Sequence, residues 1–154
     1  MRIAMLADTH VNNVEDLPKK IINALSTVDL IIHAGDFTDV QLLRDLEELS
    51  KVKAVQGNMD STELKAILPA KAIVEIKNKR IGITHGSGSP WGIEERVRKV
   101  FESDRIDILV YGHSHQSQNK VIKDILFLNP GKATDSFGIL TIGAGIKGEI
   151  VSSR

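Results

Sequence analysis

Side chains able to bind metal ions directly follow five short apolar segments of this 154-residue chain. They are Asp8, His10, Asp36, Asn58, His85, His113 and His115. Glycine adjoins most of these residues, and a glycine at the end of a strand lets the backbone turn sharply. In open α/β sheets, sites form at the carboxyl ends of the strands. If the apolar segments are strands, the pattern therefore predicts one shared site.

These seven side chains supply two carboxylates, one amide oxygen and four imidazoles, which is too many donors for one tetrahedral ion. The chain has no cysteine, so every ligand is nitrogen or oxygen. Such donors suit Mn²⁺, Fe²⁺, Co²⁺, Ni²⁺ or Zn²⁺. Two divalent ions about 3.5–4 Å apart form the usual clamp for in-line phosphoryl displacement. We therefore expect two divalent ions per chain, with Mn²⁺ as the first expectation.

Strands and helices must alternate to place these residues together. Apolar runs predict strands at residues 2–7, 29–34, 52–56, 80–84 and 106–111. Apolar residues at three- and four-residue steps predict helices at 14–25, 40–49 and 93–101. This alternation indicates βαβ units with a parallel sheet. The remaining β-type segments, 117–128 and 136–151, predict an antiparallel meander that could pack as a second sheet on the first.

Length and composition limit the classes of protein that this chain can belong to. Its length suits a single α/β domain over residues 1–154. Lys plus Arg and Asp plus Glu both number 20, so the basic excess of a general nucleic-acid binder is absent. The longest apolar run, at 137–146, is too short for a membrane helix, which needs about 20 residues. We found no targeting segment. The expectation is a cytoplasmic protein that binds neither membranes nor nucleic acid in general.

Five motifs occur in order along nearly the whole chain. They are Asp8-Thr9-His10, Gly35-Asp36, Gly57-Asn58-Met59-Asp60, Thr84-His85-Gly86 and Gly112-His113-Ser114-His115. Together they resemble the calcineurin-like metallophosphoesterase superfamily. The short chain and its Asn129-Pro130-Gly131 turn resemble the small single-domain phosphodiesterases, the YfcE-like branch. This resemblance implies a four-layer αββα sandwich with a mixed sheet and a more antiparallel C-terminal sheet.

The resemblance also implies a role for each of the seven residues. Asp8, His10 and His115 would bind the first ion. Asn58, His85 and His113 would bind the second, and Asp36 would bridge both. The implied activity is hydrolysis of small phosphodiesters, cyclic or nucleotide-derived ones among them, by in-line attack of a metal-bridging hydroxide. A small phosphodiester is therefore the expected partner, and a homodimer is plausible although no motif supports it.

The chain departs from the superfamily at Met59 and Lys132. The commonest pattern has a histidine at the position of Met59, thought to assist the leaving group or bind phosphate. Methionine cannot donate a proton, which argues against hydrolysis of monoesters with poor leaving groups. A metal-dependent phosphomonoesterase stays an alternative, as does a non-catalytic scaffold resembling the retromer-coat subunit of this fold. Lys132 replaces a more usual serine. It could bind phosphate near the mouth of the site or be a solvated turn residue, and we favour the solvated residue.

Several polar residues have a structural explanation that needs no ligand. His33 lies within an apolar run, so we expect a hydrogen-bonded core residue. Asp39 is expected to cap the second helix, and Asp60 with Glu63 fits a capping box before the next. Trp91 could line the substrate entrance or pack at a helix start, and the sequence favours neither.

Overall fold

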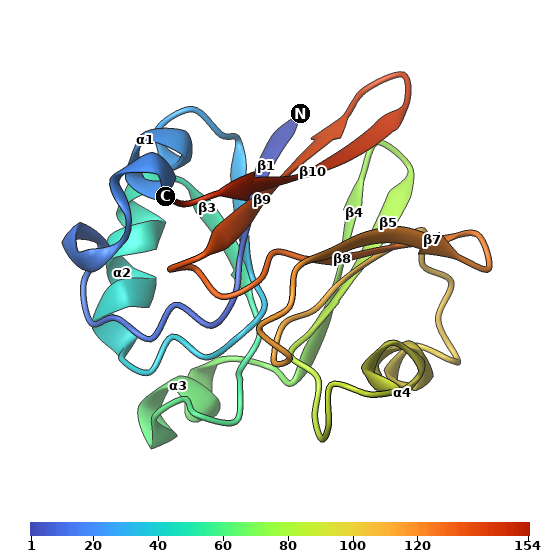
Figure 1. The fold of residues 1–154 in the computed structure, drawn as a ribbon, viewed down its shortest axis with the longest axis horizontal. Coiled ribbons are helices and arrows are strands. Elements are labelled where there is room, and N and C mark those ends of the chain that lie inside the picture. Colours follow the sequence, from blue (N-terminus) through green and yellow to red (C-terminus); the bar gives the residue numbers. More distant parts are fainter.

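Two five-stranded β-sheets pack face to face in the computed structural model, which describes residues 1–154 (Figure 1). The first sheet contains, in spatial order, β10 (Ile146–Ser152), β9 (Ser136–Ile142), β1 (Arg2–Leu6), β2 (Leu30–His33) and β3 (Lys51–Ala54). The second contains β4 (Lys71–Ile76), β5 (Lys79–Thr84), β6 (Ile108–Val110), β8 (Ile125–Asn129) and β7 (Gln118–Ile122). Three adjacent strands of each sheet are parallel, and the others are antiparallel. The predicted α/β class with mixed sheets is confirmed.

Helices cover the outer face of each sheet, so that the four layers are helix, sheet, sheet and helix (Figure 1). The helices are a 3₁₀ turn (Val14–Asp16), α1 (Lys19–Leu25), α2 (Val40–Leu49), α3 (Thr62–Ile67) and α4 (Ile93–Val100). Helices α1 and α2 pack on the first sheet, and α4 packs on the second. No helix is long and apolar enough to span a membrane.

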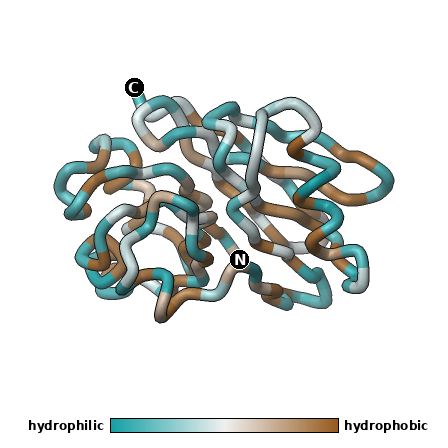
Figure 2. Tube along the Cα trace, turned by 90° about the horizontal axis from the view of Figure 1, so that it is seen from below, coloured by the Kyte–Doolittle hydropathy of each residue, from teal (hydrophilic) through white to brown (hydrophobic).

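Strand β1 shows why its sequence is apolar without a break. Ile3 and Met5 belong to the cluster between the two sheets, whereas Ala4 and Leu6 belong to the cluster beneath the helices. Successive side chains of a strand point to opposite faces, and both faces of this strand are buried. Figure 2 shows brown, hydrophobic stretches of the tube through the middle of the molecule and teal, hydrophilic stretches in many of the outer loops.

The division of strands between the sheets differs from the expectation. Strands β5 and β6 belong to the second sheet, whereas the C-terminal β9–β10 hairpin joins the first sheet through β1. Strand β4 was not predicted at all, although Lys77-Asn78, both with positive φ, forms the tight turn that pairs it with β5. Hydrophobic periodicity identifies a strand but not its neighbours, because strand pairing depends on segments that are distant in the chain.

Candidate metal centre

All seven predicted ligands lie after the carboxyl ends of parallel strands, and these strands come from both sheets. Strands β1, β2 and β3 of the first sheet precede Asp8, His10, Asp36 and Asn58, and strands β5 and β6 of the second precede His85, His113 and His115. The loops that directly follow these strands, here called the exit loops, are joined to one another by hydrogen bonds across the two sheets. The backbone N–H of His113 donates to Asp8 Oδ2 at 3.1 Å. The site is therefore built between two sheets, not along one edge.

Most of the predicted ligands have a left-handed backbone conformation. Positive φ angles occur at Asp8 (52°), His10 (50°), Asp36 (64°), His113 (69°) and His115 (60°). This conformation is uncommon in residues other than glycine and costs about 1–3 kcal/mol for each residue. Residues that adopt it cluster at functional sites. The surrounding structure therefore holds these side chains in place at a cost to stability.

Two glycines, which have no side chain, make room for the carboxylates of the two aspartates. A Cβ on Gly57 would overlap the Asp36 carboxylate, and a Cβ on Gly112 would lie 2.8 Å from the Ala7 side chain and 3.0 Å from Asp8 Oδ2. Real Cβ atoms do not approach other atoms this closely. The glycines beside Asn58 and His113 are thus explained by the close approach of the loops that follow the strands.

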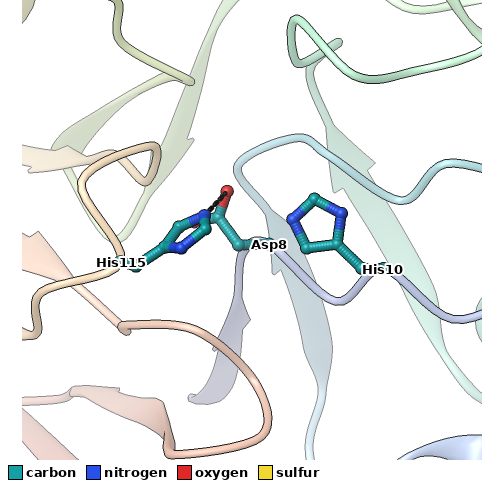
Figure 3. Close-up of side chains that lie close together, drawn as sticks. All are labelled: Asp8, His10 and His115. Carbon is teal, nitrogen blue, oxygen red and sulfur yellow. Dashed lines mark ion pairs between the residues drawn. The ribbon is translucent and has the colours of Figure 1, made fainter.

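Asp8, His10 and His115 form a first group whose ligand atoms all lie within 4.8 Å of one another (Figure 3). Figure 3 shows the two imidazoles on opposite sides of the carboxylate. His115 Nε2 lies 3.4 Å from Asp8 Oδ1, and the centroids of the two rings are 5.8 Å apart. One carboxylate and two imidazoles, carried by the loops that follow β1 and β6, thus point toward one another.

Asp8, Asp36 and His85 form a second, fully buried group within the same distance limit. His85 Nε2 lies 3.3 Å from Asp36 Oδ2 and 3.8 Å from Asp8 Oδ1. The opposite ring nitrogen, Nδ1, is 2.7 Å from the Ala34 carbonyl oxygen, which can only accept a hydrogen bond. The proton of a neutral His85 therefore sits on Nδ1, and its Nε2 lone pair faces the carboxylates, as in metal-binding histidines.

Three buried ligand atoms at this centre have no hydrogen-bond partner: Asp8 Oδ1, His10 Nε2 and His85 Nε2. Leaving a buried polar atom unpaired costs about 1–3 kcal/mol. A cation between these atoms would remove that cost, and nitrogen and oxygen donors suit a divalent transition metal. The residues present therefore fit a divalent ion.

The pKa values of the two aspartates are shifted in opposite directions. Burial raises the pKa of Asp8 to about 6, with a smaller contribution from the charge of Asp36. Burial also acts to raise the pKa of Asp36, but the close contact with His85 and the charge of its protonated ring outweigh burial, so that this pKa is lowered. The pKa of His85 is raised because its contacts with Asp36 and Asp8 outweigh its burial. Neighbouring groups with pKa values shifted apart are typical of functional sites.

His113 and Asn58 lie beside the two compact groups but belong to neither. The ring of His113 packs edge-on against that of His85, with centroids 5.2 Å apart. Its Nε2 donates to the Gly88 carbonyl at 2.9 Å, which leaves Nδ1 free to bind an ion. Asn58 is exposed and lines the same cavity as His85.

Asp60 is a positioning residue that the sequence did not reveal. Its buried carboxylate accepts hydrogen bonds from the backbone N–H groups of Gly57 (2.7 Å), Asp36 (3.1 Å) and Thr38 (2.9 Å). It thus joins the loops that carry Asp36 and Asn58. The predicted capping role was wrong, because the cap of α3 is Ser61, whose side chain accepts from the backbone of the helix.

Other structural explanations from the sequence had mixed outcomes. His33 is a buried core residue, as predicted: it bonds Thr9 and the Gly35 N–H and stacks on Phe37, and burial lowers its pKa to about 3. The cap of α2 is also confirmed, since the predicted Asp39 side chain accepts from the N–H of Gln41. His33 thus stays neutral, and its ring nitrogens are used in hydrogen bonds within the core.

Trp91 and Lys132 are the two residues for which the sequence left alternatives open. Trp91 is 88% exposed, so it does not pack at the start of α4. Lys132 is half-buried. Its charge acts together with burial, the larger effect, to lower the pKa of His115. The turn after β8 therefore places a cation near the first group.

Arg96 of α4 holds the loop that orients His113. Its guanidinium donates to three carbonyls of this loop, those of Ser87 (2.9 Å), Ser89 and Trp91 (2.9 Å). Between them lies Gly88, whose carbonyl accepts from His113 Nε2. The chain of contacts thus runs from Arg96 through the loop to the ring of a predicted ligand.

Replacing Arg96 should weaken metal binding without removing any ligand. We expect Arg96→Met to lower the affinity for one of the bound ions by about 10–100-fold, as loss of a supporting contact does at other metal sites. Calorimetric titration of metal-stripped protein measures this. Arg98→Met, on the exposed face of the same helix, is the matched control. Equal affinities of the two variants would show that the loop does not position His113.

Comparison with known proteins relates the whole chain to one family. The pattern of the calcineurin-like phosphoesterase superfamily domain matches residues 1–144. A probable metallophosphoesterase of Methanocaldococcus jannaschii is 41% identical over 136 residues, which cover 87% of this chain and 69% of that protein. A phosphodiesterase of the same organism is 29% identical over 160 residues, covering 93% and 91%. The crystal structure of Vps29 from Entamoeba histolytica with Zn²⁺ has a TM-score of 0.78 and 25% identity, covering 100% of both chains.

Proposed function

We propose that this chain, which belongs to the calcineurin-like phosphoesterase superfamily, is a phosphodiesterase that uses two divalent metal ions to hydrolyse small phosphodiesters. The observation that carries the proposal is the convergence of three buried, unpartnered ligand atoms between Asp8, His10 and His85. Further support is the relative of Methanocaldococcus jannaschii that is named a phosphodiesterase.

Each predicted ligand has a proposed place. Asp8, His10 and His115 hold one ion, and Asn58, His85 and His113 hold the other. Asp36 belongs to the second group, where it lies 3.3 Å from His85 Nε2, and it also lies 4.0 Å from His10 Nε2 of the first group, so we assign it to both ions. When bound, divalent ions polarise phosphoryl oxygens, neutralise developing charge and make water a stronger nucleophile.

The residues of the chain prepare this chemistry in three ways. Asp36 has a lowered pKa, which keeps its carboxylate ionised and available as a ligand. The Ala34 carbonyl fixes the ring of His85, and the Gly88 carbonyl fixes that of His113. Two ions with only two aspartates leave an excess of positive charge, which favours an anionic phosphodiester.

The position of Met59 favours diesters over monoesters. Its backbone N–H donates to Asp36 Oδ1 at 2.8 Å, which places the residue at the edge of the centre. The side chain is 60% exposed and carries no proton to transfer. A monoester with a poor leaving group therefore finds no general acid here.

Met59→His should raise monoesterase activity relative to diesterase activity. A positioned general acid contributes about 10²–10⁴-fold, so we expect the ratio of the two kcat/KM values to rise at least about tenfold. Alkyl phosphate and bis(p-nitrophenyl) phosphate are suitable substrates. Met59→Gln, which adds polarity without an acid, is the control. An unchanged ratio would mean that this position does not face the leaving group.

The proposed function is tested by restoring ions singly to metal-stripped protein. Mn²⁺ comes first, followed by Ni²⁺, Co²⁺, Fe²⁺ and Zn²⁺, each with bis(p-nitrophenyl) phosphate and cyclic nucleotides as substrates. We expect hydrolysis to return with at least one ion and the metal content to reach two per chain. Protein that binds ions but hydrolyses none of these diesters would contradict the proposal and favour the non-catalytic scaffold.

A further inference from the structure

A cavity of about 300 Å³ lies beside the candidate metal centre, between α3, β5 and α4. The predicted ligands Asn58 and His85 form part of its wall, so a group in the cavity can belong to a molecule bound at the centre. Lys65 of α3 and Arg96 of α4 also line it. None of its 12 lining residues is an aspartate or a glutamate.

The two cations of this cavity are not neutralised by carboxylates. Lys65 Nζ donates to the backbone carbonyl of Asn58 at 3.1 Å and forms no ion pair, so two of its N–H groups stay available. Arg96 donates only to backbone carbonyls. In contrast, Lys71 and Lys120 each pair with a carboxylate. The cavity thus offers uncompensated positive charge next to the centre.

The rest of the lining suits an organic group of small size. Ala70, Val97 and Val100 supply apolar surface for a sugar or an aryl ring. The Gln56 amide nitrogen donates to two backbone carbonyls, so the amide oxygen remains as an acceptor. The volume lies at the lower end of the range for small-molecule pockets, about 300–1,000 Å³.

We propose that this cavity binds one of the two ester groups of the substrate, and that this group carries a second phosphate recognised by Lys65 and Arg96. Both side chains are established phosphate binders, and hydrogen bonds between charged groups are about twice as strong as neutral ones. The inference rests on the proposed function and narrows its substrate class to phosphodiesters with a further phosphate on one ester group.

Two matched substrates test the inference: the p-nitrophenyl ester of thymidylate, and the same compound with a second phosphate on its other sugar hydroxyl. Both release nitrophenolate, so one assay serves for both. We expect kcat/KM to be at least about tenfold higher for the doubly phosphorylated compound, from the typical strength of a hydrogen bond to a charged group. Lys65→Ala should abolish most of this preference, and Lys65→Arg should retain it.

The control is Lys20→Ala, which removes an exposed helical lysine of α1 that does not line the cavity. If Lys65→Ala slows both substrates equally, Lys65 acts through Asn58 and the inference is wrong. The inference is also wrong if the wild-type protein shows no preference.

A binding measurement separates this inference from the proposed function. Calorimetry on metal-stripped protein compares thymidine bisphosphate with thymidine monophosphate, and we expect the bisphosphate to bind about tenfold more tightly. Equal affinities would overturn the inference. If no ion restores hydrolysis of any diester, the proposed function fails, and the calorimetric comparison still decides whether the cavity binds a second phosphate.

Discussion

Asp36→Asn should lose at least about 10³-fold in diesterase activity, equivalent to about 4 kcal/mol of transition-state stabilisation. The Asp36 carboxylate lies within 4.0 Å of both His85 Nε2 and His10 Nε2, and its pKa is lowered, so that it is ionised at neutral pH. An amide has nearly the same shape but no charge and a weaker donor atom. Elemental analysis of the variant should show fewer than two ions per chain.

Asp39→Asn is the matched control for this substitution. Asp39 lies three residues along the same loop, where it caps α2 through the N–H of Gln41, and asparagine is an equally good cap. Metal content and activity of this variant should equal those of the wild type. Full activity of Asp36→Asn would remove Asp36 from the centre and with it the bridging arrangement.

Asp8→Asn should stabilise the metal-free protein by about 3 kcal/mol at pH 8. Burial raises the pKa of Asp8 from 3.8 to about 6, and a shift of about two units corresponds to roughly this free energy. Asparagine tolerates the left-handed backbone and still accepts the N–H of His113. The wild type therefore carries a buried charge that the variant lacks.

The pH dependence of this stability difference shows whether the buried charge of Asp8 causes it. Between about pH 4 and pH 6 the folded metal-free wild type binds more protons at Asp8 than the unfolded chain, so its stability falls as the pH rises through this window. The stability difference between Asp8→Asn and the wild type should grow over the same window and then stay constant. Urea unfolding with a chelator present measures it, with Asp39→Asn as the control.

Adding metal should reverse the order of stability. An ion that binds only the folded state stabilises it by about 4.1 kcal/mol at about 1,000 times its dissociation constant, which exceeds the advantage of about 3 kcal/mol that Asp8→Asn has without metal. The wild type should gain this with Mn²⁺, whereas Asp8→Asn should gain much less because it lacks the carboxylate shared by both groups. If the variant is destabilised without metal and gains equally with it, Asp8 is a structural residue.

The types of the seven candidate ligands and their places in the chain could be predicted from local sequence pattern. Each of the predicted ligands follows an apolar strand, and four of the seven adjoin a glycine, which at Gly57 and Gly112 allows close approach of the neighbouring loops. These features are local, since strand periodicity and turn chemistry act over a few residues. The core role of His33 was predictable for the same reason.

Only the tertiary structure decided which residues meet. It showed that the site lies between two sheets and that β9–β10 returns to β1. It also showed that Asp60 joins two ligand loops, that Arg96 holds the loop of His113 and that Lys65 lines a cavity beside Asn58. Each of these facts depends on contacts between segments that are distant in the sequence or on the side chains that enclose a space. Local pattern carries no information on such contacts, so the chemistry of the centre could be predicted from the chain, whereas its supporting residues and the neighbouring cavity could not.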